Sequence, residues 1–184
     1  MPEIQNDLIE DIKTTFKYDP ASINYEEIIL CYPGIDALVS YRIAHALDNL
    51  NVPYIPRIIS YLAQNKTGIE IHPKAQLNSG IMIDHGTGIV IGETCVIGNN
   101  VRIYQGVTLG AISVSNRDNT NKNKRHPTIE NNVTIYANAT ILGGDTIIGE
   151  NSVIGGNVFI TNSIDKNTIV MSEKQNYVYK RKTK

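Results

Sequence analysis

A histidine beside an aspartate in a glycine-rich turn is the first candidate for chemistry in this sequence. His85 follows Asp84 and precedes the turn residues 86–88 (Gly-Thr-Gly). We expect Glu70 on the same edge of the fold, for a reason given below. A carboxylate that accepts a hydrogen bond from one imidazole nitrogen fixes the tautomer and raises the basicity of the other. His85 would then be a general base able to deprotonate an alcohol, although a plain turn histidine fits the residues equally well.

Two further segments carry charged or polar side chains that could bind a small ligand. Arg125 and His126 stand side by side before Pro127, and an arginine fork beside an imidazole suits the capture of a small carboxylate. A solvated loop end explains the same residues equally well. Asp19 precedes a proline and, taken alone, is better explained as a helix stop.

A metal site is not expected. Zinc sites between subunits of trimeric β-helices use two closely spaced histidines in successive turns and a third histidine. His72, His85 and His126 contain no such pair.

Several glycines would let an extended ligand approach the backbone, although tight corners also tolerate glycine well. They are Gly106, Gly110, Gly143, Gly144, Gly155 and Gly156. A pantetheine arm, with its two amides, would suit such a surface.

The element that must position these residues is a repeat with a period of six. Aliphatic residues mark it at Ile71, Leu77, Ile83, Ile91, Ile97, Ile103, Leu109, Ile129, Ile135 and Ile141, and, after a slip of one, at Leu142, Ile148, Ile154 and Ile160. A hexapeptide period is typical of a parallel β-helix, in which three rungs close a triangular coil of about 18 residues. The absence of Trp and the two Phe agree with a narrow aliphatic interior.

Two interruptions of the repeat predict where the site lies. One falls around Asp84 and His85, and the other is the polar segment 111–126, which we expect to be an extruded loop. Ile71, Ile91 and Leu109 should stack above one another. From this stacking we predict that Glu70, the Asp84–His85 bulge and the loop gather on one edge of the prism. Insertions of repeat proteins often collect on a functional face, so this edge is the predicted site.

The chain before the repeat is expected to be helical. Helical spacing of Leu8, Ile9, Ile12 and Phe16 predicts a helix over 6–16. Further helices are expected over 24–31, from Pro33 onward, and over 57–65. The predicted organisation is a helical region over 1–66, a β-helix over 67–170 and a basic tail over 171–184.

Composition narrows the class of protein. The 184 residues carry a net charge of -1, which allows one domain and argues against a nucleic-acid partner. We see neither a signal peptide nor an apolar run long enough to span a membrane. Two distant cysteines, Cys31 and Cys95, predict a reduced, cytoplasmic protein.

With these motifs in place, the sequence resembles serine O-acetyltransferase, a family of the hexapeptide-repeat acyltransferases. The resemblance rests on IDHGTGIVIGET, RHPTI and, upstream, YDPAS and ALVSYRIAHAL. It covers about residues 17–160 and implies a mainly β protein, a left-handed parallel β-helix after a small helical region. It also implies transfer of the acetyl group of acetyl-CoA to L-serine, the first step of cysteine synthesis from serine, by a homotrimer.

The resemblance also implies a role for each matching residue. His85 would be the general base and Glu70, where many members have Asp, its orienting partner. Asp19 and Asp84 would bind the serine ammonium group, and Arg125 and His126 its carboxylate. The backbone at Gly110, Ala111, Ala137 and Gly156 would line the acetyl-CoA groove. Neighbouring chains would share each site.

Some residues depart from the family pattern. The sequence after Gly110 is Ala111-Ile112-Ser113 rather than Gly-Thr-Gly, with a longer loop. The chain ends in Lys184 and not in the Ile that docks into cysteine synthase, so no stable complex with that enzyme is expected. The alternatives are an acetyltransferase of the same fold with another hydroxyl or amine acceptor, and a β-helix without catalytic activity that serves assembly.

Overall fold

The computed structural model describes residues 2–112 and 124–173. The predicted loop 111–126 is therefore described only at its two ends, and the predicted tail 171–184 only up to residue 173. Four helices come first: α1 (Pro2–Tyr18), α2 (Tyr25–Cys31), α3 (Pro33–Asn49) and α4 (Ile55–Thr67). None of the described helices is both long and apolar enough to cross a membrane.

Local sequence signals explain where these helices begin and end. The Asn24 side chain caps α2 by accepting a hydrogen bond from the Glu27 amide at 2.8 Å. Pro33 occupies the first turn of α3, where its missing N–H costs nothing. Gly68 ends α4 in the left-handed conformation, with φ of 73°, and its N–H bonds to the Gln64 carbonyl.

Helix α1 buries a charged residue between α3 and the start of the β-helix. Ile9 and Phe16 are exposed, whereas Asp11 is completely buried. Asp11 accepts two hydrogen bonds from the Arg42 guanidinium of α3, at 2.8 and 2.9 Å, and one from the Ile81 amide at 2.7 Å. The helix expected over 6–16 is present and longer at both ends, and this buried ion pair lies at its interface with α3.

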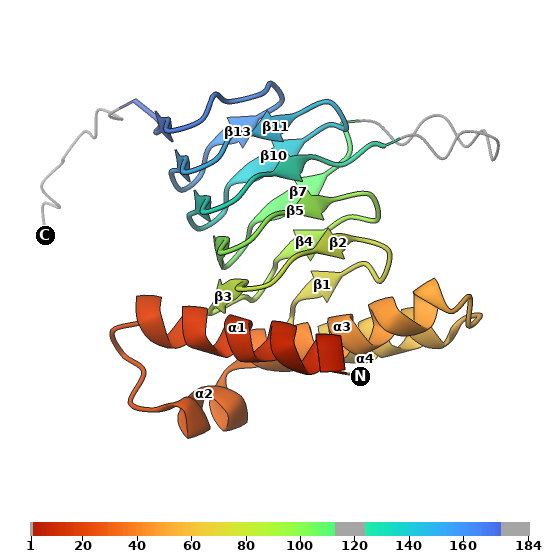
Figure 1. The fold of residues 1–184 in the computed structure, drawn as a ribbon. Helices are drawn as coiled ribbons and strands as arrows, with labels where there is room; N and C mark the ends of the chain where they lie inside the picture. Colours follow the sequence, from red (N-terminus) through yellow and green to blue (C-terminus); the bar gives the residue numbers. More distant parts are fainter. Residues whose placement is uncertain (1, 113–123, 174–184) are drawn as a thin grey trace, which may run out of the picture.

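The repeat forms short parallel strands, one per rung. They are β1 (Glu70–Ile71), β2 (Gln76–Leu77), β3 (Met82–Asp84), β4 (Val90–Ile91), β5 (Val96–Ile97), β6 (Arg102–Tyr104), β7 (Thr108–Gly110), β8 (Thr128–Ile129), β9 (Thr134–Ile135), β10 (Thr140–Leu142), β11 (Ile147–Ile148), β12 (Val153–Ile154), β13 (Phe159–Ile160) and β14 (Ile169–Val170). They stack into three sheets, which we call sheet A (β1-β4-β7-β10-β13), sheet B (β2-β5-β8-β11) and sheet C (β3-β6-β9-β12-β14). The predicted fold class, a parallel β-helix after a small helical region, is confirmed (Figure 1).

The aliphatic column of each sheet fills the interior. Ile71 pairs with Ile91, and Ile91 pairs with Leu109, as the stacking argument predicts. Ile91 and Leu109 are at most 1 % exposed. Aliphatic side chains from successive coils stack directly on one another inside the prism. The interior is therefore narrow and has no room for large aromatic rings.

The helices close the lower end of the stack (Figure 1). Their side chains bond to backbone groups of the first coil that a preceding coil would otherwise satisfy. Ser60 of α4 donates to the Ile71 carbonyl at 2.7 Å, while the Tyr41 hydroxyl of α3 donates to the Ala75 carbonyl at 2.6 Å and accepts from the Leu77 amide. The helical region is thus fixed rigidly to the first coil, which matters because it carries Asp19.

Candidate active site

His85 lies at the corner of the prism where the chain passes from sheet C to sheet A. The insertion puts His85 itself in the left-handed region, with φ of 57°, a conformation that histidine, like asparagine and aspartate, adopts more often than other non-glycine residues. Its side chain is 71 % exposed, and Nε2 lies 3.8 Å from Oδ2 of Asp84. That distance is too long for a hydrogen bond, so the imidazole projects into solvent beside a carboxylate.

The helical region brings Asp19 to the same corner. Tyr32 donates a hydrogen bond from its hydroxyl to Asp19 Oδ2 at 2.6 Å, and the Ala21 amide donates to Oδ1 at 2.8 Å. Burial raises the pKa of Tyr104, and the charges of both Asp84 and Asp19 raise it further. The two carboxylates therefore act on one small region, which we call the His85 edge (Asp19, Tyr32, Asp84 and His85).

Glu70 begins the sheet A strand β1 and pairs with Val90 of β4, so it lies at the same corner as His85, one coil before it. Its carboxylate accepts a hydrogen bond from the Gln64 amide at 3.2 Å. Within residues 2–112 and 124–173, no hydrogen bond joins Glu70 to His85. The orienting role of Glu70 stays a prediction.

The end of the loop is held at a different corner, between sheets A and B. Glu93 forms ion pairs with Lys74, at 3.3 Å, and with Arg125. Burial raises the pKa of Glu93, but hydrogen bonds from Arg125 and Lys74 and the His72 charge outweigh it, so the net pKa is lowered. We call this group the His126 edge (Glu93, Thr94, Arg125 and His126).

The prediction that the loop shares an edge with His85 was wrong. His85 precedes the sheet A strand β4, whereas the loop follows the sheet A strand β7, and β4 pairs with β7. One whole side of the triangular coil therefore separates the two features. The six-residue spacing predicts correctly which residues stack in one sheet. It does not distinguish the corner before a strand, where His85 lies, from the corner after it, where the loop begins.

The backbone positions predicted to line an acetyl-CoA groove divide in the same way. Gly110 ends β7 and Ala111 follows it, at the corner of the His126 edge where the loop begins. Ala137 and Gly156 lie above one another at the corner of the His85 edge, where the Asn157 amide donates to the Ala137 carbonyl at 2.9 Å. A β-carbon added to Gly156 would lie 3.0 Å from that carbonyl oxygen.

The two edges carry complementary chemistry. The His85 edge combines an exposed imidazole with carboxylates, which suits a hydroxyl to be deprotonated and a cationic group. The His126 edge combines a guanidinium with an imidazole, which suits a carboxylate. Together they match an α-amino acid that bears a hydroxyl group. In one chain, however, the two edges lie at the two different corners that flank sheet A.

Sequence reasoning did not single out Tyr32, Glu93 or Thr94. Tyr32 directly precedes the proline that starts α3, and it reaches Asp19 only because α2 folds back. Glu93 and Thr94 fill a corner of the repeat, at positions 92–95, where polar residues are ordinary. Their partner Arg125 at the loop end lies 32 and 31 positions further along the sequence, so no local pattern marked the pairing.

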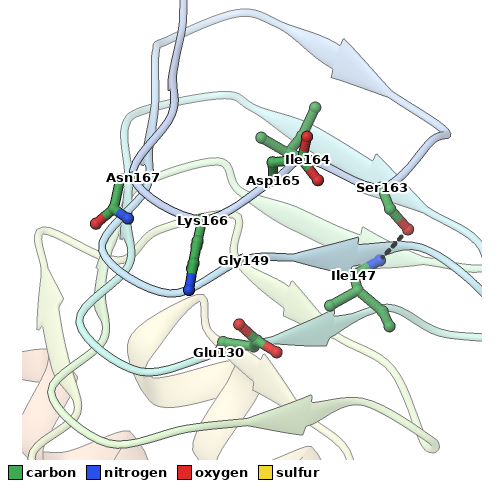
Figure 2. A pocket seen from close by; sticks show the side chains of 8 residues that line it. All are labelled: Glu130, Ile147, Gly149, Ser163, Ile164, Asp165, Lys166 and Asn167. Atoms are coloured by element: carbon green, nitrogen blue, oxygen red, sulfur yellow. Dashed lines mark hydrogen bonds between the residues drawn. The ribbon is translucent and has the colours of Figure 1, made fainter.

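An open groove lies elsewhere, on the upper rungs of sheet B (Figure 2). It is lined by Glu130, Ile147, Gly149, Ser163, Ile164, Asp165, Lys166 and Asn167. It contains none of the predicted site residues, and its lining mixes acid, base and aliphatic groups without a shared chemistry. In the described part of the chain, no group of three His, Cys, Asp or Glu side chains is placed to hold a metal.

Known sequences match much of this chain. The family described as "Bacterial transferase hexapeptide (six repeats)" matches residues 126–162. A serine acetyltransferase of Synechocystis sp. is 48 % identical over 128 residues, which cover 70 % of this chain and 49 % of the relative. One of Helicobacter pylori is 49 % identical over 127 residues, covering 69 % of this chain and 71 % of the relative. The chain spans about half the length of the curated relatives that it matches first.

Solved structures match the whole arrangement of helices and coils. Serine acetyltransferase isoform 3 of Entamoeba histolytica, in complex with cysteine, aligns with a TM-score of 0.89 and 41 % identity over 97 % of this chain and 62 % of that one. The Neisseria gonorrhoeae enzyme in complex with serine gives 0.86 and 34 %, over 94 % and 68 %. A serine acetyltransferase in complex with CoA gives 0.82 and 35 %, over 91 % and 66 %.

Proposed function

Because the chain belongs to the serine acetyltransferase family of hexapeptide-repeat transferases, we propose that it transfers the acetyl group of acetyl-CoA to the hydroxyl of L-serine. The products are O-acetyl-L-serine and CoA, and the reaction is the first step of cysteine synthesis from serine. The observation that carries this proposal is the complementary chemistry of the two edges. An ammonium group, a carboxylate and a hydroxyl each find a matching group there.

The division of the site between two edges supports a homotrimer. The edges flank sheet A, so each prism has one of them on either side of that sheet. When three prisms pack around a threefold axis, one edge of a protomer meets the other edge of its neighbour. Each of the three interfaces would then hold one complete site, with His85 from one protomer and His126 from the next.

His85 is the general base of the proposed reaction. Its imidazole takes the proton of the serine hydroxyl while the serine oxygen attacks the carbonyl carbon of the thioester. The carbon–sulfur bond then breaks, and the thiolate takes the proton from the imidazolium. Glu70 orients the ring, Asp19 and Asp84 bind the ammonium group, and Arg125 and His126 bind the carboxylate.

The acetyl-CoA groove runs parallel to the axis of the β-helix, between neighbouring protomers. Gly110 and Ala111 of one protomer and Ala137 and Gly156 of the next offer backbone amides and carbonyls to the pantetheine arm. Their small side chains support this role, because an extended ligand can lie against the backbone there. Two unpaired cysteines, exposed Cys31 and buried Cys95, fit a cytoplasmic enzyme.

Release of CoA from acetyl-CoA, followed with a thiol reagent, tests the proposal. The acceptors are L-serine, D-serine, L-homoserine, L-threonine and several amino sugars. We expect release with L-serine and a fall of about 10²–10⁴-fold in kcat for His85→Ala, with the same mass in solution as the parent protein. A much higher kcat/KM for another acceptor would overturn the assignment of serine. Unchanged turnover in His85→Ala would overturn the assignment of the base.

A further inference from the structure

Thr94 contacts all three residues that close the loop. Its hydroxyl oxygen accepts hydrogen bonds from the backbone amides of Arg125, at 2.9 Å, and His126, at 3.1 Å. Its carbonyl accepts a hydrogen bond from Lys124 Nζ at 3.1 Å. One side chain and its own peptide groups therefore fix the place where the loop rejoins the prism.

The same residue fixes the ring of His126. The Thr94 amide donates to His126 Nδ1 at 3.1 Å, and the Thr94 hydroxyl lies 2.9 Å from the same nitrogen. A backbone amide can only donate, so Nδ1 must offer its lone pair. Because the hydroxyl oxygen already accepts two N–H groups, its own hydrogen is free to point to Nδ1 as well.

Those contacts determine which tautomer the ring adopts. A neutral imidazole carries one hydrogen, and with Nδ1 as acceptor that hydrogen must sit on Nε2. Burial lowers the pKa of His126, as do the charges of Arg125 and Lys124, while Glu93 opposes them. The ring is therefore held neutral, with a single N–H donor. In the described part of the chain, Nε2 has no hydrogen-bond partner of its own.

Gly92 gives an independent sign that the ring has a fixed place. A β-carbon at this position would lie 2.1 Å from Cδ2 and 2.2 Å from Nε2 of His126. Gly92 does not have a positive φ, so its backbone conformation is open to any residue. The close approach of the imidazole is what requires glycine here.

We propose that Thr94 is the positioning residue of the His126 edge: it holds His126 as the neutral Nε2–H tautomer, so that the ring presents a donor to the carboxylate of the amino-acid substrate. The part that concerns the substrate rests on the proposed function. The tautomer does not, because it follows from the hydrogen bonds of this chain alone.

Nitrogen NMR of histidine-labelled protein at pH 8 tests the tautomer. The chain has four histidines, and comparison with His126→Asn identifies the signals of His126. We expect one signal pair typical of Nε2–H in the parent protein and in Thr94→Ser. Thr94→Val keeps the backbone amide but loses the three hydroxyl hydrogen bonds that hold the loop end and the ring against it. The ring can then move away from that amide, so we expect a mixture of tautomers in this variant. An Nδ1–H ring, or a mixture, in the parent protein would overturn the inference whatever the activity.

Steady-state kinetics on the same variants test the positioning role. Thr94→Val should raise KM for serine about tenfold and leave KM for acetyl-CoA within about twofold of the parent value, while Thr94→Ser restores serine binding. Thr128→Val is the matched control, because no hydrogen bond of its hydroxyl is found among the described residues. A normal tautomer and a normal KM for serine in Thr94→Val would overturn the positioning role. If no variant acetylates serine, the proposed function fails, and the NMR result still decides the tautomer.

Discussion

Replacing Tyr32 by phenylalanine removes one oxygen atom from the candidate site and leaves the rest of α2 and α3 in place. The hydroxyl donates to Asp19 Oδ2 at 2.6 Å, the shorter of two hydrogen bonds that hold this carboxylate. That bond raises the pKa of Tyr32, followed by the effects of burial and of the Asp19 charge. Tyr32 therefore remains a protonated donor at any pH at which the enzyme would work.

The size of the effect follows from the kind of bond. A hydrogen bond to a charged group contributes about 1.5–3 kcal/mol when its partner is buried. Tyr32 is only half-buried, so solvent replaces part of the loss and about 1–2 kcal/mol is the reasonable range. If Asp19 binds the ammonium group, a free carboxylate must be reordered at each binding event. We expect kcat/KM for serine to fall by about 5–30-fold, mostly through KM.

The assay is steady-state CoA release at varied serine and, separately, at varied acetyl-CoA. Tyr25→Phe is the matched control: Tyr25 begins α2, which ends one residue before Tyr32, its ring packs at a tilt against Phe16, and it is 45 % exposed. Asp19→Asn shows how far kcat/KM for serine falls when the carboxylate charge itself is removed. If Asp19→Asn raises KM for serine and Tyr32→Phe does not, Tyr32 does not hold the carboxylate. A rise in KM for acetyl-CoA of equal size would place Asp19 outside the serine site.

Two further predictions concern the attachment of the helical region. Asp11→Asn leaves the Arg42 guanidinium, 4 % exposed, with only the partly exposed Asp7 as a charged partner, so the free energy of unfolding in urea at fixed protein concentration should fall by about 2–4 kcal/mol. The double variant Asp11→Leu with Arg42→Met should recover most of that loss, and a loss below about 1 kcal/mol in the single variant would contradict the reasoning. Gly34→Ala should lower the same free energy by about 1–3 kcal/mol, because the new β-carbon would lie 2.3 Å from the Ile83 carbonyl oxygen. Helix propensity alone favours alanine by about 1 kcal/mol, so a stabilised variant would refute the close contact.

The β-helix could be predicted because its signal is local and repeated. Each rung places one aliphatic residue inward, and Ile71, Ile91 and Leu109 pair in the register that the spacing demands. The polar interruptions were equally visible, since a segment such as 111–126 cannot line an aliphatic interior. The spacing did not reveal that the corners before and after a strand lie on different edges of the prism. The loop was therefore assigned to the wrong corner.

The contacts that tune the site could not be predicted, because they join distant parts of the chain. Asp11 bonds to Arg42, which lies 31 positions further along the chain. Tyr32 reaches Asp19 through the fold of two helices, and Thr94 meets His126 across the whole loop. Such pairs depend on tertiary geometry, and a single sequence contains no record of them.

The closure of the first coil by α1, α3 and α4 gives the stack a beginning. An uncovered edge of a parallel sheet is a template on which another chain can add a strand. At the first coil that edge is already bonded to Ser60 and Tyr41, so no second copy can continue the array from below. The helices therefore block strand addition at the first coil, so the repeat cannot be extended at that end. A variant without these helices would expose the template and should grow into fibres.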